Sequence, residues 1–259
     1  MINKTAQPVT VIMKRLLALC LLTCFQAYAE PLSLGLDLKE GGRLTPKAVS
    51  QFERYMALQD CELKIETDSQ KISKSDLYFS ALDLPPLLPS HNKVLSASIL
   101  NNEPLTITIL VKSSTGISDL SSLQGERLAI ISYISHVGGI KATTLLTASG
   151  LDLNKGKIYQ TGNYLGAMSL LLHGDVFMAA IPGPLARQWL KHNELTIIAE
   201  SEPTETGGLF IKPLIGQARK ASCITAFKSL KKEHRRDKKM VIFPSWLTGF
   251  KLINHTESL

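Results

Sequence analysis

The segment from residue 118 to residue 200 switches regularly between two kinds of hydrophobic pattern. Four strand candidates occupy residues 127–132, 157–160, 176–181 and 195–199. The first of them is a continuous apolar run, as expected for a strand that is covered on both faces. Three segments with helical spacing lie between them, at residues 138–149, 164–173 and 184–192. A glycine follows each of the first two, and glycine commonly ends a helix. Strands that alternate with helices predict right-handed βαβ units and a parallel sheet.

The flanking segments also contain strand and helix signals. Alternating apolar and polar positions mark strand candidates at residues 31–38, 61–67, 76–80, 94–100, 105–112 and 209–212. A helix is expected from Thr45 to about Leu58, because Thr45 can cap it and Pro46 suits the first helical position. Residues 217–232 carry apolar side chains at three-residue spacing, which predicts an amphipathic helix. The fold class is therefore α/β, with a compact middle segment and a tail that can return to the N-terminal part.

The first 29 residues have the pattern of a cleavable signal peptide. Lys14 and Arg15 precede a mostly apolar run of ten residues, Leu16–Phe25, and Gln26–Ala29 has small residues where signal peptidase cuts. A helix of this length reaches about 15 Å, whereas the hydrocarbon core of a bilayer is ~30 Å thick. We therefore expect cleavage after Ala29 and a periplasmic location.

Composition narrows the class of protein further. The chain has 259 residues, of which 44% are hydrophobic and 20% charged, and this balance excludes a disordered tail, collagen and coiled coil. The net charge is +7, and removal of the signal peptide lowers it to +4. This excess does not indicate nucleic acid as a partner. The basic run at residues 231–239 lacks interleaved aromatic side chains, so a solvated helix end is favoured over contact with a membrane or an acidic partner.

The four cysteines separate into two pairs. Cys20 and Cys24 lie in the signal peptide, and neither follows the small residue that a lipoprotein anchor requires. Cys61 and Cys223 remain after cleavage, in a compartment that oxidises thiols. A disulfide between them and two separate buried thiols are both open interpretations. There is no CxxC motif, so a redox catalyst is not expected.

Motifs for catalysis or metal binding are not found in the sequence. The six histidines show no HxxH or HExxH spacing, and no GxSxG elbow is present. We therefore expect no metal site, no cofactor and no enzymatic activity.

The order and spacing of short motifs resemble one family of binding proteins, and Ser118–Ala180 carries most of this resemblance. The motifs are ISDLSSLQGERLAIISYISHVGGIKATTLLTASGLDL and, further on, GNYLGAMSLLLHGDVFMAAIPGPLA. They are similar to those of the periplasmic phosphonate/phosphite substrate-binding proteins of ABC importers, which belong to the two-lobed periplasmic binding proteins. The resemblance implies two α/β lobes with mixed or parallel sheets, joined by two crossover strands, with ligand bound in the cleft between them.

On this resemblance the crossovers fall near residues 105–112 and 200–212. Lobe 1 is then discontinuous, residues 30–105 plus 205–259, and lobe 2 is residues 106–204. Cys61 and Cys223 fall in the same lobe under this division, as a disulfide between them requires.

The candidate binding site follows two strands of the middle segment. In open α/β sheets, ligands bind beyond the carboxyl ends of the strands. The loop Ser132–Gly139 lies there and leads into a helix, whose free amide groups and positive dipole end favour an anion. A second loop follows the next strand. The candidate ligand-binding residues are Ser132, Ser135, His136, Val137 and Gly138 in the first loop, and Thr161, Asn163 and Tyr164 in the second.

Two of these residues have alternative roles. The family resemblance implies that Ser135 holds the anionic head of the ligand, but serine at this place also commonly caps its helix. Tyr164 stands where many relatives have a histidine that contacts the anion, and its hydroxyl can still donate a hydrogen bond. Packing of its ring at the start of a helix is the other interpretation.

The sequence departs from the family pattern at two places. Phe177 replaces an acidic residue of the relatives, and only residues 68–76 separate two strands of the first lobe where the relatives have a helix. A shortened first lobe implies a different or smaller ligand, or none.

The expected function is therefore an exported solute-binding protein that captures a small oxyanion, such as phosphonate, phosphite or phosphate, for an ABC importer. Its expected partners are this ligand and an ABC permease or membrane sensor, and we expect a monomer. The alternative is a divergent binding module that acts as a periplasmic sensor or accessory protein without a role in transport.

Overall fold

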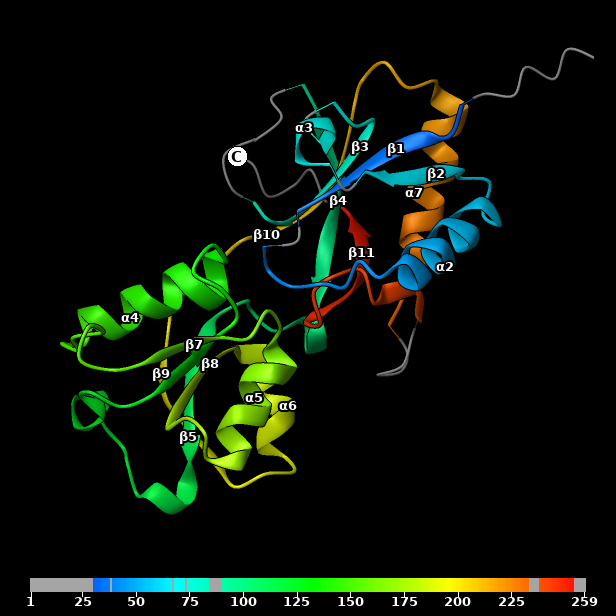
Figure 1. Ribbon diagram of the computed structural model, residues 1–259. Coiled ribbons are helices and arrows are strands. Elements are labelled where there is room, and N and C mark those ends of the chain that lie inside the picture. Colours follow the sequence, from blue (N-terminus) through cyan, green and yellow to red (C-terminus); the bar gives the residue numbers. More distant parts are fainter. Residues whose placement is uncertain are drawn as a thin grey trace, which may run out of the picture. The chain divides into compact units, whose positions relative to one another are not determined.

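The computed structural model describes residues 30–253, apart from residues 38, 67, 73, 84–89 and 233–237 (Figure 1). The predicted signal peptide and most of the basic run therefore lie outside the described residues. The described residues from Leu32 onward form one compact unit. Within the described ranges, no helix has the length and apolar character needed to cross a membrane.

The first of two sheets has six strands in the order β11-β4-β10-β3-β1-β2 (Figure 1). Strand β1 is parallel to both β2 and β3, whereas β10 runs antiparallel to β3 and β4, and β11 antiparallel to β4. The strands are β1 (Leu32–Leu36), β2 (Leu63–Glu66), β3 (Leu77–Leu82), β4 (Asn92–Ile99), β10 (Thr206–Ile211) and β11 (Leu247–Leu252). The two C-terminal strands thus complete a sheet that the N-terminal part begins.

Three helices pack against strands of this sheet, namely α2 (Pro46–Ala57), α3 (Ser69–Ile72) and α7 (Gln217–Ser229). The Thr45 hydroxyl caps α2 by accepting from the Ala48 amide at 3.2 Å, as expected. Helix α3 is a single turn, because the short connection between β2 and β3 leaves no room for more. A group of aromatic rings packs edge to face in the core beside this sheet, namely Phe52, Phe79, Phe227, Phe243 and Phe250.

The pairing that the sequence left open for the two remaining cysteines is present. Cys61, just before β2, forms a disulfide with Cys223 of α7. Both side chains are buried.

The second sheet has five strands in the order β7-β6-β8-β5-β9. Its elements are β5 (Ile107–Lys112), β6 (Leu128–Ile130), β7 (Ile158–Gln160), β8 (Met178–Pro182) and β9 (Leu195–Glu200), with helices α4 (Ala142–Ala148), α5 (Tyr164–His173) and α6 (Gly183–Leu190). The four strands predicted to be parallel, β6 to β9, run in the same direction, whereas β5, which lay outside that prediction, is inserted between β8 and β9 and is antiparallel to both. Strand β5 enters directly from the other sheet, so no helical crossover sets its direction, whereas β6 is parallel to β7 and β8 as expected.

Two chain segments connect the sheets, one between β4 and β5 and one between β9 and β10. They lie side by side at Leu105 and Thr204, which form an antiparallel bridge, with the Thr204 amide 2.7 Å from the Leu105 carbonyl oxygen. The predicted crossover ranges contain this point. The exact division into lobes stays a prediction.

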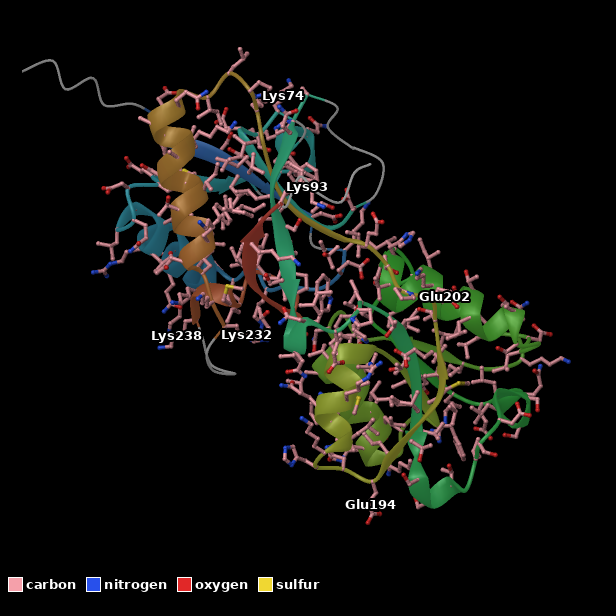
Figure 2. All side chains as sticks on the ribbon, turned by 180° about the vertical axis from the view of Figure 1, so that it is seen from behind. Lys74, Lys93, Glu194, Glu202, Lys232 and Lys238 are labelled. Atoms are coloured by element: carbon pink, nitrogen blue, oxygen red, sulfur yellow. A yellow bond between two sulfur atoms is a disulfide. The ribbon has the colours of Figure 1, made fainter. Side chains whose placement is uncertain are left out.

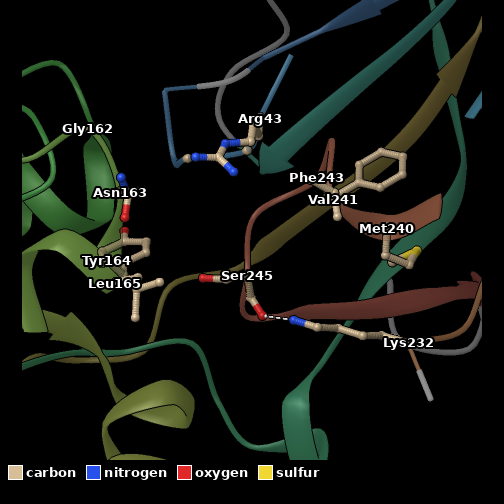
Figure 3. Close-up of a pocket in the computed structure, with 12 residues that line it drawn as sticks. Arg43, Gly162, Asn163, Tyr164, Leu165, Lys232, Met240, Val241, Phe243 and Ser245 are labelled. Carbon is tan, nitrogen blue, oxygen red and sulfur yellow. Dashed lines mark hydrogen bonds between the residues drawn. The ribbon is translucent and has the colours of Figure 1, made fainter. Parts of the chain in front are cut away.

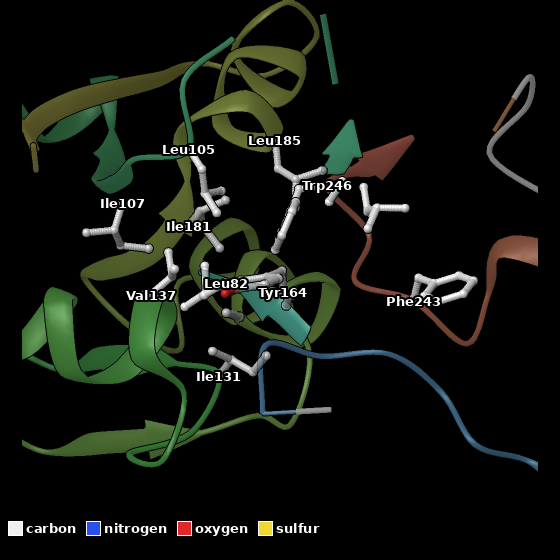
Figure 4. Packing of buried hydrophobic residues seen from close by; sticks show 14 of the residues in the cluster. Leu82, Leu105, Ile107, Ile131, Val137, Tyr164, Ile181, Leu185, Phe243 and Trp246 are labelled. Atoms are coloured by element: carbon white, nitrogen blue, oxygen red, sulfur yellow. The ribbon is translucent and has the colours of Figure 1, made fainter. Parts of the chain in front are cut away.

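The buried hydrophobic side chains form one cluster that includes residues of both sheets. Figure 4 shows part of it, where Leu82 and Trp246 lie near Leu105, Leu185 and Tyr164. Charged side chains such as Lys74, Glu194 and Lys238 are exposed and project outward (Figure 2).

Candidate ligand-binding site

The loop after β6, residues 132–139, is called the oxyanion loop below. The sequence leads from it into a π-helical turn, His136–Lys141, and then into α4. Ser135 is fully buried, and its hydroxyl oxygen accepts from the Gly138 amide at 2.9 Å, so it caps this turn. Gly138 allows a close approach, because a Cβ there would lie only 2.7 Å from the Tyr164 hydroxyl. The loop is therefore tightly packed around its amide groups.

The carboxylate of Glu40 occupies the oxyanion loop. The Ser135 hydroxyl donates to Oε2 at 2.9 Å, and the His136 amide donates to Oε1 at 2.5 Å. The Val137 amide lies 3.2 Å from both carboxylate oxygens. Glu40 is only 1% exposed. The loop thus binds a carboxylate, which in this structure belongs to a side chain of the same protein.

Glu40 reaches the loop from the segment between β1 and α2. Gly41 and Gly42 follow it with φ angles of +90° and +128°, in the left-handed region that favours glycine. A Cβ on Gly41 would also approach the Ile131 side chain to 3.2 Å. The two glycines therefore let the chain turn sharply while it presents the Glu40 side chain.

Two opposing sets of interactions act on the pKa of the Glu40 carboxyl. Burial raises the pKa of the Glu40 carboxyl, and the nearby negative charge of Asp37 raises it further. The hydrogen bonds from Ser135, Val137 and His136 favour the charged form and oppose this rise in pKa. Three donors directed at two oxygens are the arrangement expected for an ionised carboxylate.

Tyr164 adds a fourth polar group at the same place. Its hydroxyl is buried beside Glu40 and Ser135, and it completes no hydrogen bond with any described residue. Burial raises the pKa of this hydroxyl, and the charge of Glu40 raises it further, so the group keeps its proton. The Tyr164 hydroxyl is therefore a buried donor close to the Glu40 carboxylate that completes no hydrogen bond with it.

The structure brings together only some of the predicted site residues. Ser135, His136, Val137, Gly138 and Tyr164 surround the Glu40 carboxylate, and His136 contributes its backbone amide rather than its ring to the contact.

The remaining predicted residues form local hydrogen bonds, and Asn163 also lines the cavity described below. The Ser132 hydroxyl accepts from the Ile134 amide, at 3.4 Å. The Thr161 hydroxyl donates to the carbonyl oxygen of Ile130 at 3.0 Å, and Asn163 caps α5 by accepting from the Gly166 amide at 2.8 Å.

Sequence reasoning missed Glu40. The available signal was an acidic residue directly before two glycines, in a connection that leads from a strand to a helix. An acidic residue argues against an anion site when it is considered alone, and nothing local shows that it meets a loop about 95 residues later in the chain.

A cavity of about 530 Å³ is bordered by Tyr164 and Leu165 on one side and by Arg43, Val241 and Ser245 on the other (Figure 3). Tyr164 thus lies beside both this cavity and the Glu40 carboxylate, and Gly41, the neighbour of Glu40, also lines the cavity. Arg43 and Lys232 give it positive charge, and Leu165 and Val241 are among its apolar walls. Lys232 is held by the Ser245 carbonyl oxygen, 2.5 Å from its Nζ atom. Among the described residues, no group of three or more acidic, histidine or cysteine side chains could hold a metal ion.

Comparisons with known proteins identify the family and the fold. The profile of one family, described as ABC transporter, phosphonate, periplasmic substrate-binding protein, matches residues 91–257. No curated protein sequence matches the chain.

Solved structures with the same fold include PhnD1 from Prochlorococcus marinus in complex with methylphosphonate. Its TM-score is 0.60 at 12% identity, with 88% of this chain and 94% of that one covered. A binding protein component of an ABC phosphonate transporter from Pseudomonas aeruginosa has a TM-score of 0.58 at 11% identity, covering 88% of this chain and 83% of that one. The two-lobed periplasmic binding fold is therefore shared. Because the family profile covers most of the chain, this protein belongs to the periplasmic substrate-binding proteins of phosphonate ABC transporters, a family of binding proteins and not of enzymes.

Proposed function

We propose that the protein is exported, loses residues 1–29, and captures a small oxyanion of the phosphonate, phosphite or phosphate type for an ABC importer. The observation that carries this proposal is the occupied oxyanion loop with its one unused donor. Ser135, His136 and Val137 already donate to two oxygens of a carboxylate. A tetrahedral head with three terminal oxygens offers a third acceptor, and the Tyr164 hydroxyl is a buried donor without a partner among the described residues. The donor set thus fits three oxygens better than two.

The neighbouring cavity supports a ligand with a body as well as a head. Its volume of about 530 Å³ lies within the range of pockets that hold small molecules. Arg43 is exposed and its guanidinium forms no ion pair with any described residue, so it is available to attract an anion. The family match favours a role in transport over the alternative of a sensor or accessory protein.

The proposal is tested by calorimetric titration of the purified protein with methylphosphonate, phosphite, inorganic phosphate, a sulfonate and acetate. Saturable binding of at least one phosphorus oxyanion is expected. Ser135→Ala should weaken that binding by about tenfold or more, because a hydrogen bond to a charged group is worth roughly 1.5–3 kcal/mol. Tyr164→Phe should weaken binding of the three-oxygen heads and leave any acetate binding unchanged.

Matched control variants distinguish the loss of a ligand contact from a non-specific effect of substitution on the fold. Ser169→Ala changes an exposed serine of α5, and Tyr159→Phe removes a tyrosine hydroxyl of β7, outside the oxyanion loop, and neither should alter affinity. Binding that survives Ser135→Ala and Tyr164→Phe unchanged would place the site elsewhere. No binding by the wild type and by a variant with Glu40 replaced would contradict the proposal as a whole.

A further inference from the structure

Glu40 and an external ligand compete for the same donors. The hydroxyl of Ser135 and the amides of His136 and Val137 all point to the Glu40 carboxylate, which is almost completely buried. A second oxyanion cannot use these donors while the carboxylate holds them. Two like charges in one buried loop would also repel each other strongly.

We infer that Glu40 is a built-in competitor in the oxyanion loop, a tethered carboxylate that an external ligand must displace before it binds. This inference rests on the proposed function of the loop. Because Glu40 belongs to the same chain, it is present at the loop at a high effective concentration, independent of the solution. The apparent affinity of an external anion is then its intrinsic affinity multiplied by the fraction of molecules in which the loop is vacant.

The backbone next to Glu40 supports this role. The Glu40 side chain is carried on a turn rather than on a strand or helix, and Gly41 and Gly42 follow it in conformations that favour glycine. Glycine has wide backbone freedom, so this turn can swing the carboxylate out without breaking an element of the sheet. The cavity is lined by both of these glycines and by Tyr164, so it adjoins the turn that carries Glu40.

Competition with Glu40 also makes the site selective. A carboxylate ligand offers two oxygens and gains no contact that Glu40 does not already make. A head with three terminal oxygens can also accept from Tyr164, whose hydroxyl Glu40 leaves unsatisfied. Glu40 therefore excludes carboxylates more effectively than it excludes phosphorus oxyanions, and it sets the specificity of the site as well as its affinity.

The test compares calorimetric affinities of the wild type, Glu40→Gln and Glu40→Ala for methylphosphonate, inorganic phosphate and acetate. The glutamine side chain keeps the size of glutamate, but its NH₂ group meets a backbone amide instead of accepting from it, so it holds the loop less well. Both variants should bind the phosphorus anions about tenfold tighter or more, in proportion to the vacated fraction. Acetate binding should appear or strengthen in Glu40→Ala.

Asp37→Asn is the matched control. It removes one negative charge near Glu40, but the Asp37 carboxylate contacts the amide of Lys39 and not the oxyanion loop. A gain in affinity shared equally by Asp37→Asn would mean that net charge causes the effect, and would overturn the inference. Circular dichroism checks that each variant is folded.

Hydrogen exchange gives a second readout that needs no ligand. The amides of His136 and Val137 should exchange faster in Glu40→Ala than in the wild type or Asp37→Asn, because Glu40 covers them. Equal exchange in all three, or wild-type affinity equal to that of Glu40→Gln, would overturn the inference and leave the proposed function intact. Absence of binding in every variant would instead refute the proposed function, and this inference with it.

Discussion

Ser135 combines two roles in one hydroxyl group. Its oxygen accepts from the Gly138 amide, as a helix cap does, and its proton is donated to the Glu40 carboxylate. The cap fixes the direction of the hydroxyl, and it therefore aims the proton at the place where an anion lies. The two interpretations of this serine are compatible, because capping is what positions the donor.

The tight packing around Gly138 leads to a prediction about stability. Gly138→Ala would place a methyl group against the Ile131 side chain and 2.7 Å from the Tyr164 hydroxyl. Overpacking of this kind typically costs about 1–3 kcal/mol, so the midpoint of urea unfolding should fall. Gly216→Ala is the control, since nothing lies within 4 Å of a Cβ there. If both variants unfold at the same urea concentration, the loop is less closely packed than described.

The sequence pattern included Ser135, His136 and Val137 among the candidate residues, but it did not predict that Glu40 accepts their hydrogen bonds. Ser135 and Tyr164 stand out locally, because each follows a predicted strand and begins a predicted helix. Glu40 becomes important only through a contact with a distant loop, and a single chain carries no local pattern for such a contact.

Among the helices and strands, the first and last residues were predicted most accurately where the sequence carries a local cap or a terminating glycine. Helix α5 begins at Tyr164 after the Asn163 cap and ends before Gly174, where the sequence predicts it. Strand β11 was not predicted, since Gly249 interrupts its apolar pattern and the strand is fixed by pairing with β4. The direction of β5 likewise depends on neighbours far away in the sequence.

Strand β4 begins next to the buried His91, whose protonation affects the stability of the fold. The Nε2 atom of His91 lies 2.9 Å from the Ser75 carbonyl oxygen, and Ser90 contacts Nδ1. Burial lowers the pKa of His91, and the charge of Lys212 lowers it further, while Ser75 and Asp76 act in the opposite direction. The unfolded chain therefore binds a proton more readily than the folded protein does as the pH falls below about 6.5.

We therefore expect His91 to lower the free energy of unfolding as the pH falls from 7.5 to 5, whereas the raised pKa of Glu40 acts in the opposite direction. Relative to the wild type, His91→Gln should therefore lose less, or gain more, free energy of unfolding over this pH range. Urea unfolding at several pH values measures it. His192→Gln changes an exposed histidine and should keep the wild-type dependence. An identical pH profile for His91→Gln and the wild type would show that His91 does not contribute.

At the scale of the whole molecule, the disulfide closes a very long loop. Cys61 and Cys223 are 162 residues apart, and the entire five-stranded sheet lies between them in the sequence. On the chain-entropy view a cross-link of this span restricts the unfolded chain by roughly 5 kcal/mol. The replacement of both cysteines by alanine should therefore lower the urea midpoint strongly. Wild-type protein treated with a reductant should behave like this double variant, and an unchanged midpoint in both would contradict the expectation.

The strand order also determines when each sheet can assemble. All strands of the five-stranded sheet come from one continuous segment, residues 107–200, whereas β10 is inserted between β3 and β4 of the other sheet. A growing chain that has not yet reached Thr206 therefore leaves the facing edges of β3 and β4 without a neighbour. Open edges of this kind invite aggregation. During biogenesis, protection by a chaperone would matter most for this N-terminal portion, until the last fifth of the polypeptide arrives to cover it.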